Sequence, residues 1–154
     1  MPDKPEEKPK LRFQRSNFVV ADIDRAMTFY GDVLGFDLVF VKESADDSYS
    51  FDVFEIDKSN KMRFAVLGTP QQKNVMALTE VPSVKPITNM PRRSAIILEI
   101  VEIDRVVEQS KALGLKVYPE DKLITKDGRE GREIGIVDFD GNLVVIYLIT
   151  KAAA

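Results

Sequence analysis

Residues 22–40, which read DIDRAMTFYGDVLGFDLVF, set the architecture, because residues 102–118, EIDRVVEQSKALGLKVY, repeat their pattern. Asp24-Arg25 and Asp104-Arg105 lie eighty positions apart, and each pair begins a helical pattern that ends at a glycine. The glycine comes eleven steps after Asp24 and ten steps after Asp104, so the second copy is one residue shorter. A chain built twice from one unit forms a seam or cleft between its halves, and small molecules bind in clefts.

The same order of elements is expected around each copy. In the first half, strands over 11–20, 36–41, 62–67 and 74–80 accompany a helix that Asp22 caps and Gly35 ends. In the second half, strands over 94–100, 115–118, 132–137 and 143–149 accompany a helix over 104–113. Asp140-Gly141 lies between two apolar runs and predicts a tight turn. Each half is therefore strand, helix and three strands, or βαβββ.

Composition divides the rest of the chain. Residues 1–10 alternate in charge, contain three prolines and predict a disordered arm. The first module covers 11–80, with an insertion at 43–60 whose Phe51, Val53 and Phe54 suit either a strand or a short helix. A proline-rich linker follows at 81–91, then the second module at 92–150, which contains a charged loop at 119–131, and a tail at 151–154.

Charge and residue usage exclude several classes of function. The chain has 154 residues, no cysteine, no histidine and a net charge of −3. No disulfide, thiol or imidazole chemistry is possible, and the charge argues against nucleic acid as a partner. No apolar run approaches the length of a membrane span, and the first ten residues lack the apolar region of a signal peptide. We therefore expect no membrane partner and a cytoplasmic location.

Two motifs extend the repeat to a known family. Phe29-Tyr30-x-x-Val33-Leu34-Gly35-Phe36 ends the first helix, and Asp138-Phe139-Asp140-Gly141-Asn142-Leu143 precedes the last strand. With the two βαβββ units, they make the chain resemble, over residues 11–150, the vicinal oxygen chelate superfamily of glyoxalase I, extradiol dioxygenases and bleomycin-resistance proteins. The resemblance implies an α+β fold whose two βαβββ modules form an open, barrel-like cleft. It also implies a homodimer, with the cleft within one chain or shared across the interface.

The resemblance further implies where a metal ion would bind. In metal-using members, the first strand of each half carries a histidine or glutamine, and the last strand of each half carries a glutamate. The corresponding positions in this chain are Arg15, Ala77, Ala95 and Val145. An arginine is always charged, and the other three side chains offer no lone pair to a metal. Moving by one residue, to Ser16, Met76, Ser94 and Val144 or Ile146, restores no set of ligands. We therefore expect no metal site, no cofactor, and no glyoxalase- or dioxygenase-type metal chemistry.

Alternation along the strands predicts which side chains share a face with these positions. The ligand-binding candidates are Arg15, Asn17, Thr79, Ile97, Glu99 and Tyr147. Two roles are open for Arg15: it grips a carboxylate, phosphate or enolate of the ligand, or it forms an internal ion pair with Glu99.

Three functions fit these residues. The first is a metal-independent protein that binds a small, mainly apolar organic molecule, as bleomycin-resistance proteins do. The second is a metal-free isomerase, epimerase or lyase acting on a carbonyl or carboxylate compound, with Glu99 or Glu80 as the base and Arg15 stabilising an anion. The third is an inactive relative of such enzymes whose surface engages another protein.

Overall fold

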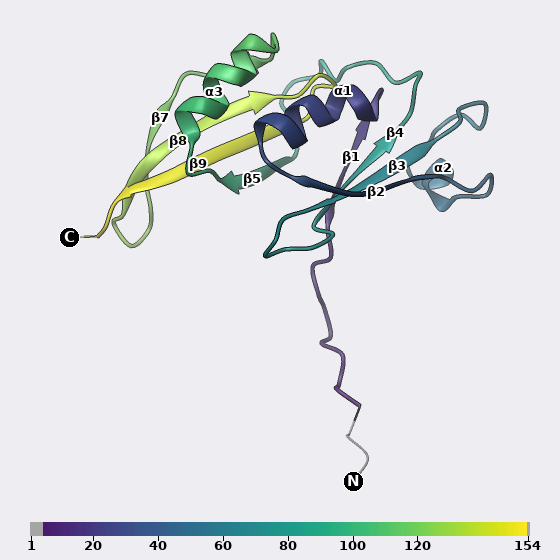
Figure 1. Cartoon of the computed structure of the whole chain (residues 1–154), viewed down its shortest axis with the longest axis horizontal. Coiled ribbons are helices and arrows are strands. Elements are labelled where there is room, and N and C mark those ends of the chain that lie inside the picture. Colours follow the sequence, from purple (N-terminus) through teal and green to yellow (C-terminus); the bar gives the residue numbers. More distant parts are fainter. Residues whose placement is uncertain (1–4, 154) are drawn as a thin grey trace.

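A computed structural model of the chain describes residues 5–153 and has two sheets side by side, with two of its helical segments, residues 23–33 and 103–112, along the same side (Figure 1). The first module contains β1 (Ser16–Val20), α1 (Ile23–Met27), the π-helix η1 (Thr28–Val33), β2 (Asp37–Glu43), α2 (Tyr49–Val53), β3 (Arg63–Gly68) and β4 (Met76–Glu80). The second contains β5 (Ala95–Glu99), α3 (Ile103–Ala112), β6 (Lys116–Val117), β7 (Asp121–Ile124), β8 (Glu130–Val137) and β9 (Leu143–Lys151). The predicted α+β class is confirmed.

The two sheets repeat one topology. Sheet A has the order β1-β4-β3-β2, and sheet B has the order β5-β9-β8-β6, with β7 also paired to β8. In each sheet the first strand of the module runs parallel to the last, and the remaining pairs are antiparallel. The strands β1 and β5 therefore form equivalent edges, as a duplicated unit requires. Neither sheet closes into a barrel.

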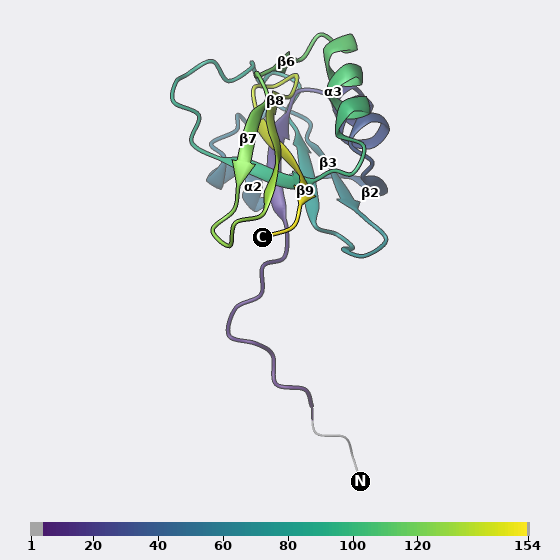
Figure 2. The ribbon, with the colours of Figure 1, turned by 90° about the vertical axis from the view of Figure 1, so that its left-hand side faces the viewer.

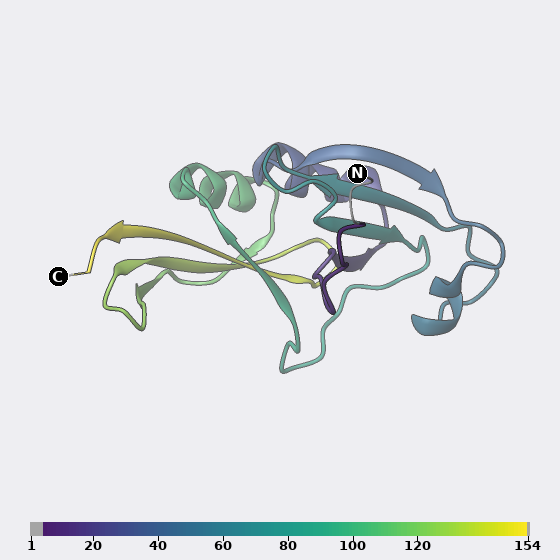
Figure 3. The ribbon, with the colours of Figure 1, turned by 90° about the horizontal axis from the view of Figure 1, so that it is seen from below.

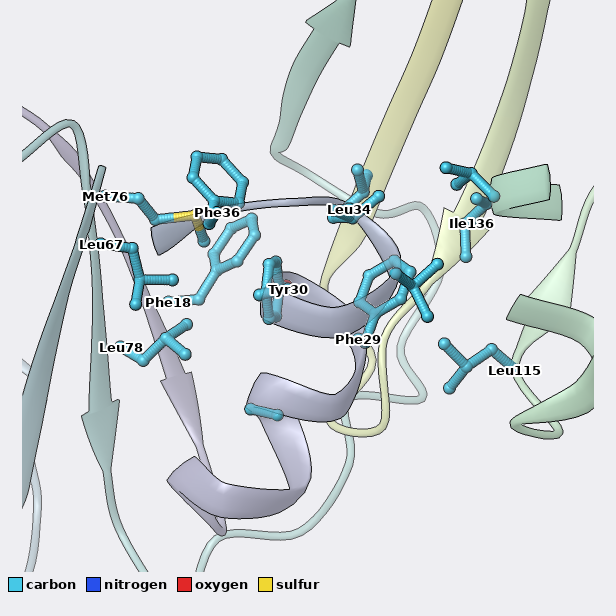
Figure 4. Packing of buried hydrophobic residues seen from close by; sticks show 14 of the residues in the cluster. Phe18, Phe29, Tyr30, Leu34, Phe36, Leu67, Met76, Leu78, Leu115 and Ile136 are labelled. Atoms are coloured by element: carbon cyan, nitrogen blue, oxygen red, sulfur yellow. The ribbon is translucent and has the colours of Figure 1, made fainter. Parts of the chain in front are cut away.

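One hydrophobic core runs through both modules. Phe29 and Tyr30 of η1 are fully buried, with ring centroids 5.1 Å apart. Figure 4 shows sheet A side chains, such as Phe18 and Leu78, on one side of η1 and Ile136 and Leu115 on the other. Burying aromatic rings of this size stabilises a fold by several kcal/mol in total. The first helical segment therefore joins the two modules rather than serving one.

The turn between β8 and β9 adds polar contacts to this joint. The Tyr30 hydroxyl donates to Asp138 Oδ2 at 2.7 Å, and the Asp138 carboxylate also accepts from the backbone N–H groups of Asp140 and Asn142. Burial, reinforced by the Asp138 charge, raises the pKa of Tyr30 well above its ordinary value. The Ala21 N–H donates to Asp140 Oδ1 at 2.8 Å. A turn of the second module is thus bonded to the first module.

The structure corrects four of the predicted boundaries. The first strand begins at Ser16 rather than Leu11, because Ser16 N–H, which bonds to the Val75 carbonyl, is the first to meet a partner on sheet A. The first helix is α-helical only to Met27 and then widens into η1, with Leu34 N–H bonding five residues back. The last strand extends to Lys151, into the predicted tail. The charged loop at 119–131 contains β7, which lengthens sheet B.

The insertion at 43–60 forms the short helix α2, followed by the turn at Asp57–Asn60. Phe51 of α2 is buried with Met62 and Val81, and Val19 of β1 packs against this cluster. Figure 3 shows α2 at the end of sheet A that lies away from sheet B. The insertion therefore covers part of the sheet A face opposite α1.

The predicted disordered arm begins with residues 1–4, which lie outside the described residues. Residues 5–15 contain no helix or strand and extend away from the sheets (Figure 1, Figure 2). They are exposed, with Leu11 at 83% and Phe13 at 74% of their full accessible surface. No helix within residues 5–153 is both long and apolar enough to cross a lipid bilayer.

Candidate functional site

Each sheet has a face that the helices α1, η1 and α3 do not cover, which we call the far face. On sheet B the strand register arranges the far face in three rows across the strands. The first row is Ala95, Leu143, Val137 and Lys116; the second is Ile97, Val145 and Gly135; the third is Glu99, Tyr147 and Glu133. Neighbouring rows are two residues apart along a strand, or about 7 Å.

The three rows differ in chemistry. Lys116 lies at one end, the centre is apolar, and Glu99 and Glu133 lie at the other end. Ile97, in the central row, is 67% exposed although it lies in the middle of β5. Ile97 forms a contiguous apolar patch with Ala95 and Val145, and such a patch is typical of a surface that binds a ligand or another subunit.

Gly135 shapes this central row. Its missing side chain leaves room for Tyr118, whose ring lies 3.1 Å from the position that a Cβ would take. The Tyr118 N–H donates to the Gly135 carbonyl, and Lys116 Nζ lies 4.7 Å from the Tyr118 ring centroid. Tyr118 and Lys116 are therefore on the far face, although they are absent from the predicted ligand-binding set. Alternation along residues 115–118 is the sequence pattern that could have placed Lys116 and Tyr118 on this face.

The far face of sheet A carries the other predicted side chains. Thr79 donates to Asn17 Oδ1 at 2.9 Å, while the buried Asn17 Nδ2 has no hydrogen-bond partner within residues 5–153. Thr79 and Ala77 are 5% and 4% exposed, so this face is more closed than that of sheet B. A buried amide N–H without a partner is costly, so Asn17 Nδ2 is an unsatisfied donor beneath this face.

Five of the six predicted ligand-binding residues lie in two groups, one on each sheet, and the sixth, Arg15, lies apart from both. Asn17 and Thr79 meet on sheet A, while Ile97, Glu99 and Tyr147 meet on sheet B. Tyr147 donates to Glu99 Oε2 at 3.1 Å, and this hydrogen bond raises the pKa of Tyr147. Arg15 precedes β1 and is exposed. The internal ion pair considered for Arg15 is wrong, because no ion pair within residues 5–153 joins it to Glu99.

The metal-ligand positions implied by the family offer no ligand set. Ala77, Ala95 and Val145 present only hydrocarbon, and Arg15 is a cation. Within residues 5–153 no three acidic side chains come close enough together to hold a metal ion. These residues do not fit the divalent ion of the metal-using members.

A groove of about 720 Å³ runs along the free edge of β5, which lines it from Ala95 to Ile100. Its other walls are the end of the first helix at Leu34–Phe36 and the starts of β1 and β4, at Ser16 and Met76. Ile97 and Glu99 therefore face both the groove and the far face. A volume of this size accommodates a small organic molecule.

Glu80, considered as a base, lies on the other face. Its carboxylate accepts two hydrogen bonds of 2.8 Å from Arg63 and one of 2.8 Å from the Ile23 N–H at the start of α1. The Arg63 hydrogen bonds are the main reason that the pKa of Glu80 is lowered. Glu80 therefore caps a helix and pairs with Arg63, and Glu99 alone remains as a candidate base.

Replacing Glu80 with glutamine is expected to make the free energy of unfolding less dependent on pH in the acidic range. The depressed pKa means that the charged pair stabilises the fold fully above about pH 4.5 and less as the carboxylate is protonated below it. At pH 7 we expect a loss of about 1–2 kcal/mol, because Arg63 is partly exposed. Urea unfolding from pH 3 to 7 measures the difference between the two proteins. A constant difference across that range contradicts the assignment.

Comparison with known proteins identifies the superfamily to which this fold belongs. The family model of the glyoxalase/bleomycin resistance protein/dioxygenase superfamily matches residues 12–146. The chain belongs to this superfamily. No curated protein matches the sequence.

Solved structures share the fold. A glyoxalase family protein from Bacillus cereus has a TM-score of 0.69 at 16% identity, covering 95% of this chain and 99% of that one. Glyoxalase I from Leishmania major has a TM-score of 0.62 at 18% identity, covering 89% and 86%. The fosfomycin resistance protein FosX from Listeria monocytogenes, solved with Mn(II) and sulfate, has a TM-score of 0.56 at 17% identity, covering 88% and 90%.

Proposed function

We propose that the protein binds a small, mainly apolar organic molecule on its far faces without a metal ion. The observation that carries this proposal is the apolar central row of sheet B, in which Ile97 is 67% exposed beside Val145 and Gly135. The position that metal-using members give to ligands is occupied here by Ala95, which adds apolar surface instead. Glu99 and Tyr147 at one side supply hydrogen-bonding groups that orient a guest.

We further propose that the protein is a homodimer in which a second copy completes the cleft. The first module walls only the groove along the edge of β5, and it leaves Ala95 and Ile97 exposed, so the rest of the far face of sheet B lacks a second wall. The far face of sheet A, with the unpartnered Asn17 amide, would supply that wall from the partner. Light scattering in solution measures the number of chains, and a monomer with ligand bound contradicts the shared cleft. The cytoplasmic location and the absence of nucleic-acid binding stay predictions.

A thermal-shift screen of small metabolites, with and without a chelator, tests the binding function. A ligand at one hundred times its Kd stabilises the native state by about 2.7 kcal/mol, which raises Tm by about 5–10 °C. We expect the shift to persist in the chelator and to disappear in Ile97→Glu.

Ile124→Glu is the matched control, because Ile124 is 64% exposed on β7 of the same module. Its partner Glu130 lies an odd number of residues along β8 from Glu133 and Gly135, so Ile124 points away from the far face. Loss of the shift in chelator, or equal effects of the two variants, contradicts the proposal. Turnover of the bound compound, abolished by Glu99→Gln, would identify the metal-free enzyme instead.

A further inference from the structure

Two cations and a phenol meet at one end of the sheet B far face. Lys116 begins β6 in the first row, and its ammonium lies 4.7 Å from the Tyr118 ring centroid. Arg92 reaches the same end from the residues before β5, where its Nη1 donates to the Gly141 carbonyl at 2.9 Å. Hydrogen bonding to Arg92, then to Lys116, lowers the pKa of the Tyr118 hydroxyl. Three polar groups from two segments thus converge.

The charge of this cluster is not balanced by the protein. Neither Arg92 nor Lys116 takes part in any of the ion pairs found within residues 5–153. The Arg92 Nε is buried and has no hydrogen-bond partner in the same part of the chain. A buried guanidinium N–H without an acceptor is costly. An anion beside the two cations supplies the opposite charge that the protein does not.

We propose that Arg92, Lys116 and Tyr118 bind the carboxylate of the apolar ligand. This inference rests on the proposed binding function and names the class of its ligand, an organic acid with an apolar body. The apolar row of Ile97, Val145 and Gly135 lies next to the cationic end. The acidic row of Glu99 and Glu133 lies about 13 Å from the first row, since the two are four residues apart along each strand. Charge therefore gives the ligand one orientation, with its anionic group beside Lys116.

Benzoate, benzamide and inorganic phosphate are the probes that test this assignment. Benzoate and benzamide have the same ring, but only benzoate carries a charge. Amide chemical shifts of the full chain, followed at Gly135 and Val145, measure binding at the far face. We expect benzoate to bind at least about tenfold more tightly than either benzamide or phosphate, and Lys116→Met and Tyr118→Phe each to weaken benzoate several-fold. Lys58→Met, an exposed lysine in the Asp57–Asn60 turn of the first module, is the control and should bind benzoate normally.

The outcomes separate this inference from the proposed function. Equal binding of benzamide and benzoate overturns the carboxylate site while leaving the apolar site intact. Phosphate binding as tightly as benzoate overturns the organic-acid assignment and identifies a site for an inorganic anion. If no probe shifts the far-face resonances, both proposals fail. Thermal unfolding of each variant in the absence of probe confirms that it is folded.

Discussion

Replacing Asp138 with alanine is expected to lower the free energy of unfolding by about 3–5 kcal/mol, because it leaves several buried donors without an acceptor. Its carboxylate accepts from the Tyr30 hydroxyl, from two backbone N–H groups and from Asn142 Nδ2. All four hydrogen bonds are buried at the joint between the modules. Urea unfolding followed by circular dichroism measures the change.

Two further variants locate the source of that loss. Tyr30→Phe removes one of the four donors and should cost about 1–2 kcal/mol. The free energy of unfolding of the double variant should be close to that of Asp138→Ala, since the Tyr30 hydrogen bond is already lost in the single variant. Asp32→Ala, at an exposed position of η1, should stay within about 0.5 kcal/mol of the original protein. An Asp138→Ala protein as stable as Asp32→Ala contradicts the role of this carboxylate.

Gly141→Ala is expected to destabilise the protein by at least about 2 kcal/mol more than Gly128→Ala. The two glycines have nearly the same φ, +86° and +85°, so alanine incurs the same backbone cost at both positions. A Cβ on Gly128 has nothing within 4 Å, whereas a Cβ on Gly141 would lie 2.5 Å from the Ile87 carbonyl oxygen and 2.7 Å from its nitrogen. The linker must then move away and lose the Ile87 N–H bond to the Asp140 carbonyl.

Thermal unfolding of the two glycine variants isolates this close approach from the backbone conformation. Gly128→Ala should cost about 1 kcal/mol, and the excess for Gly141→Ala corresponds to a further fall in Tm of about 4–8 °C. Equal values of Tm for the two variants would mean that the linker does not rest on the turn in solution.

The fold follows from the repeat, because helix-ending glycines and alternating apolar runs are local signals. Gly35 and Gly114 both end helical segments, as predicted, and both have a positive φ. Far-face assignments for Ile97, Glu99 and Tyr147 also followed, because strand alternation is local. Arg15 could not be placed, since its strand begins one residue later and the sequence does not indicate where pairing starts.

The long-range contacts of the site were not predictable in the same way. The sequence places Tyr30 in a helix-ending motif and predicts a tight turn at Asp140-Gly141, but the hydrogen bond from Tyr30 to Asp138 spans 108 positions. Arg92 follows the proline-rich linker and carries no periodic signal, so its approach to Tyr118 depends on the folded path of that linker. Glu80 and Thr79 are neighbours on β4 and point to opposite faces of sheet A. The sequence does not show which of the two faces α1, so the contact of Glu80 with the start of α1 could not be predicted.

The phenol–carboxylate bond between Tyr30 and Asp138 bears on how such a duplicated protein can evolve. Each half depends on the other: the Tyr30 hydroxyl of the first half finds its acceptor in the second, and Ile136 and Leu115 of the second half are buried in the same core as the helix of the first. Separation of the gene into two independent halves is therefore disfavoured. The two copies can diverge in their ligand-facing strands, but each still needs the other in order to fold.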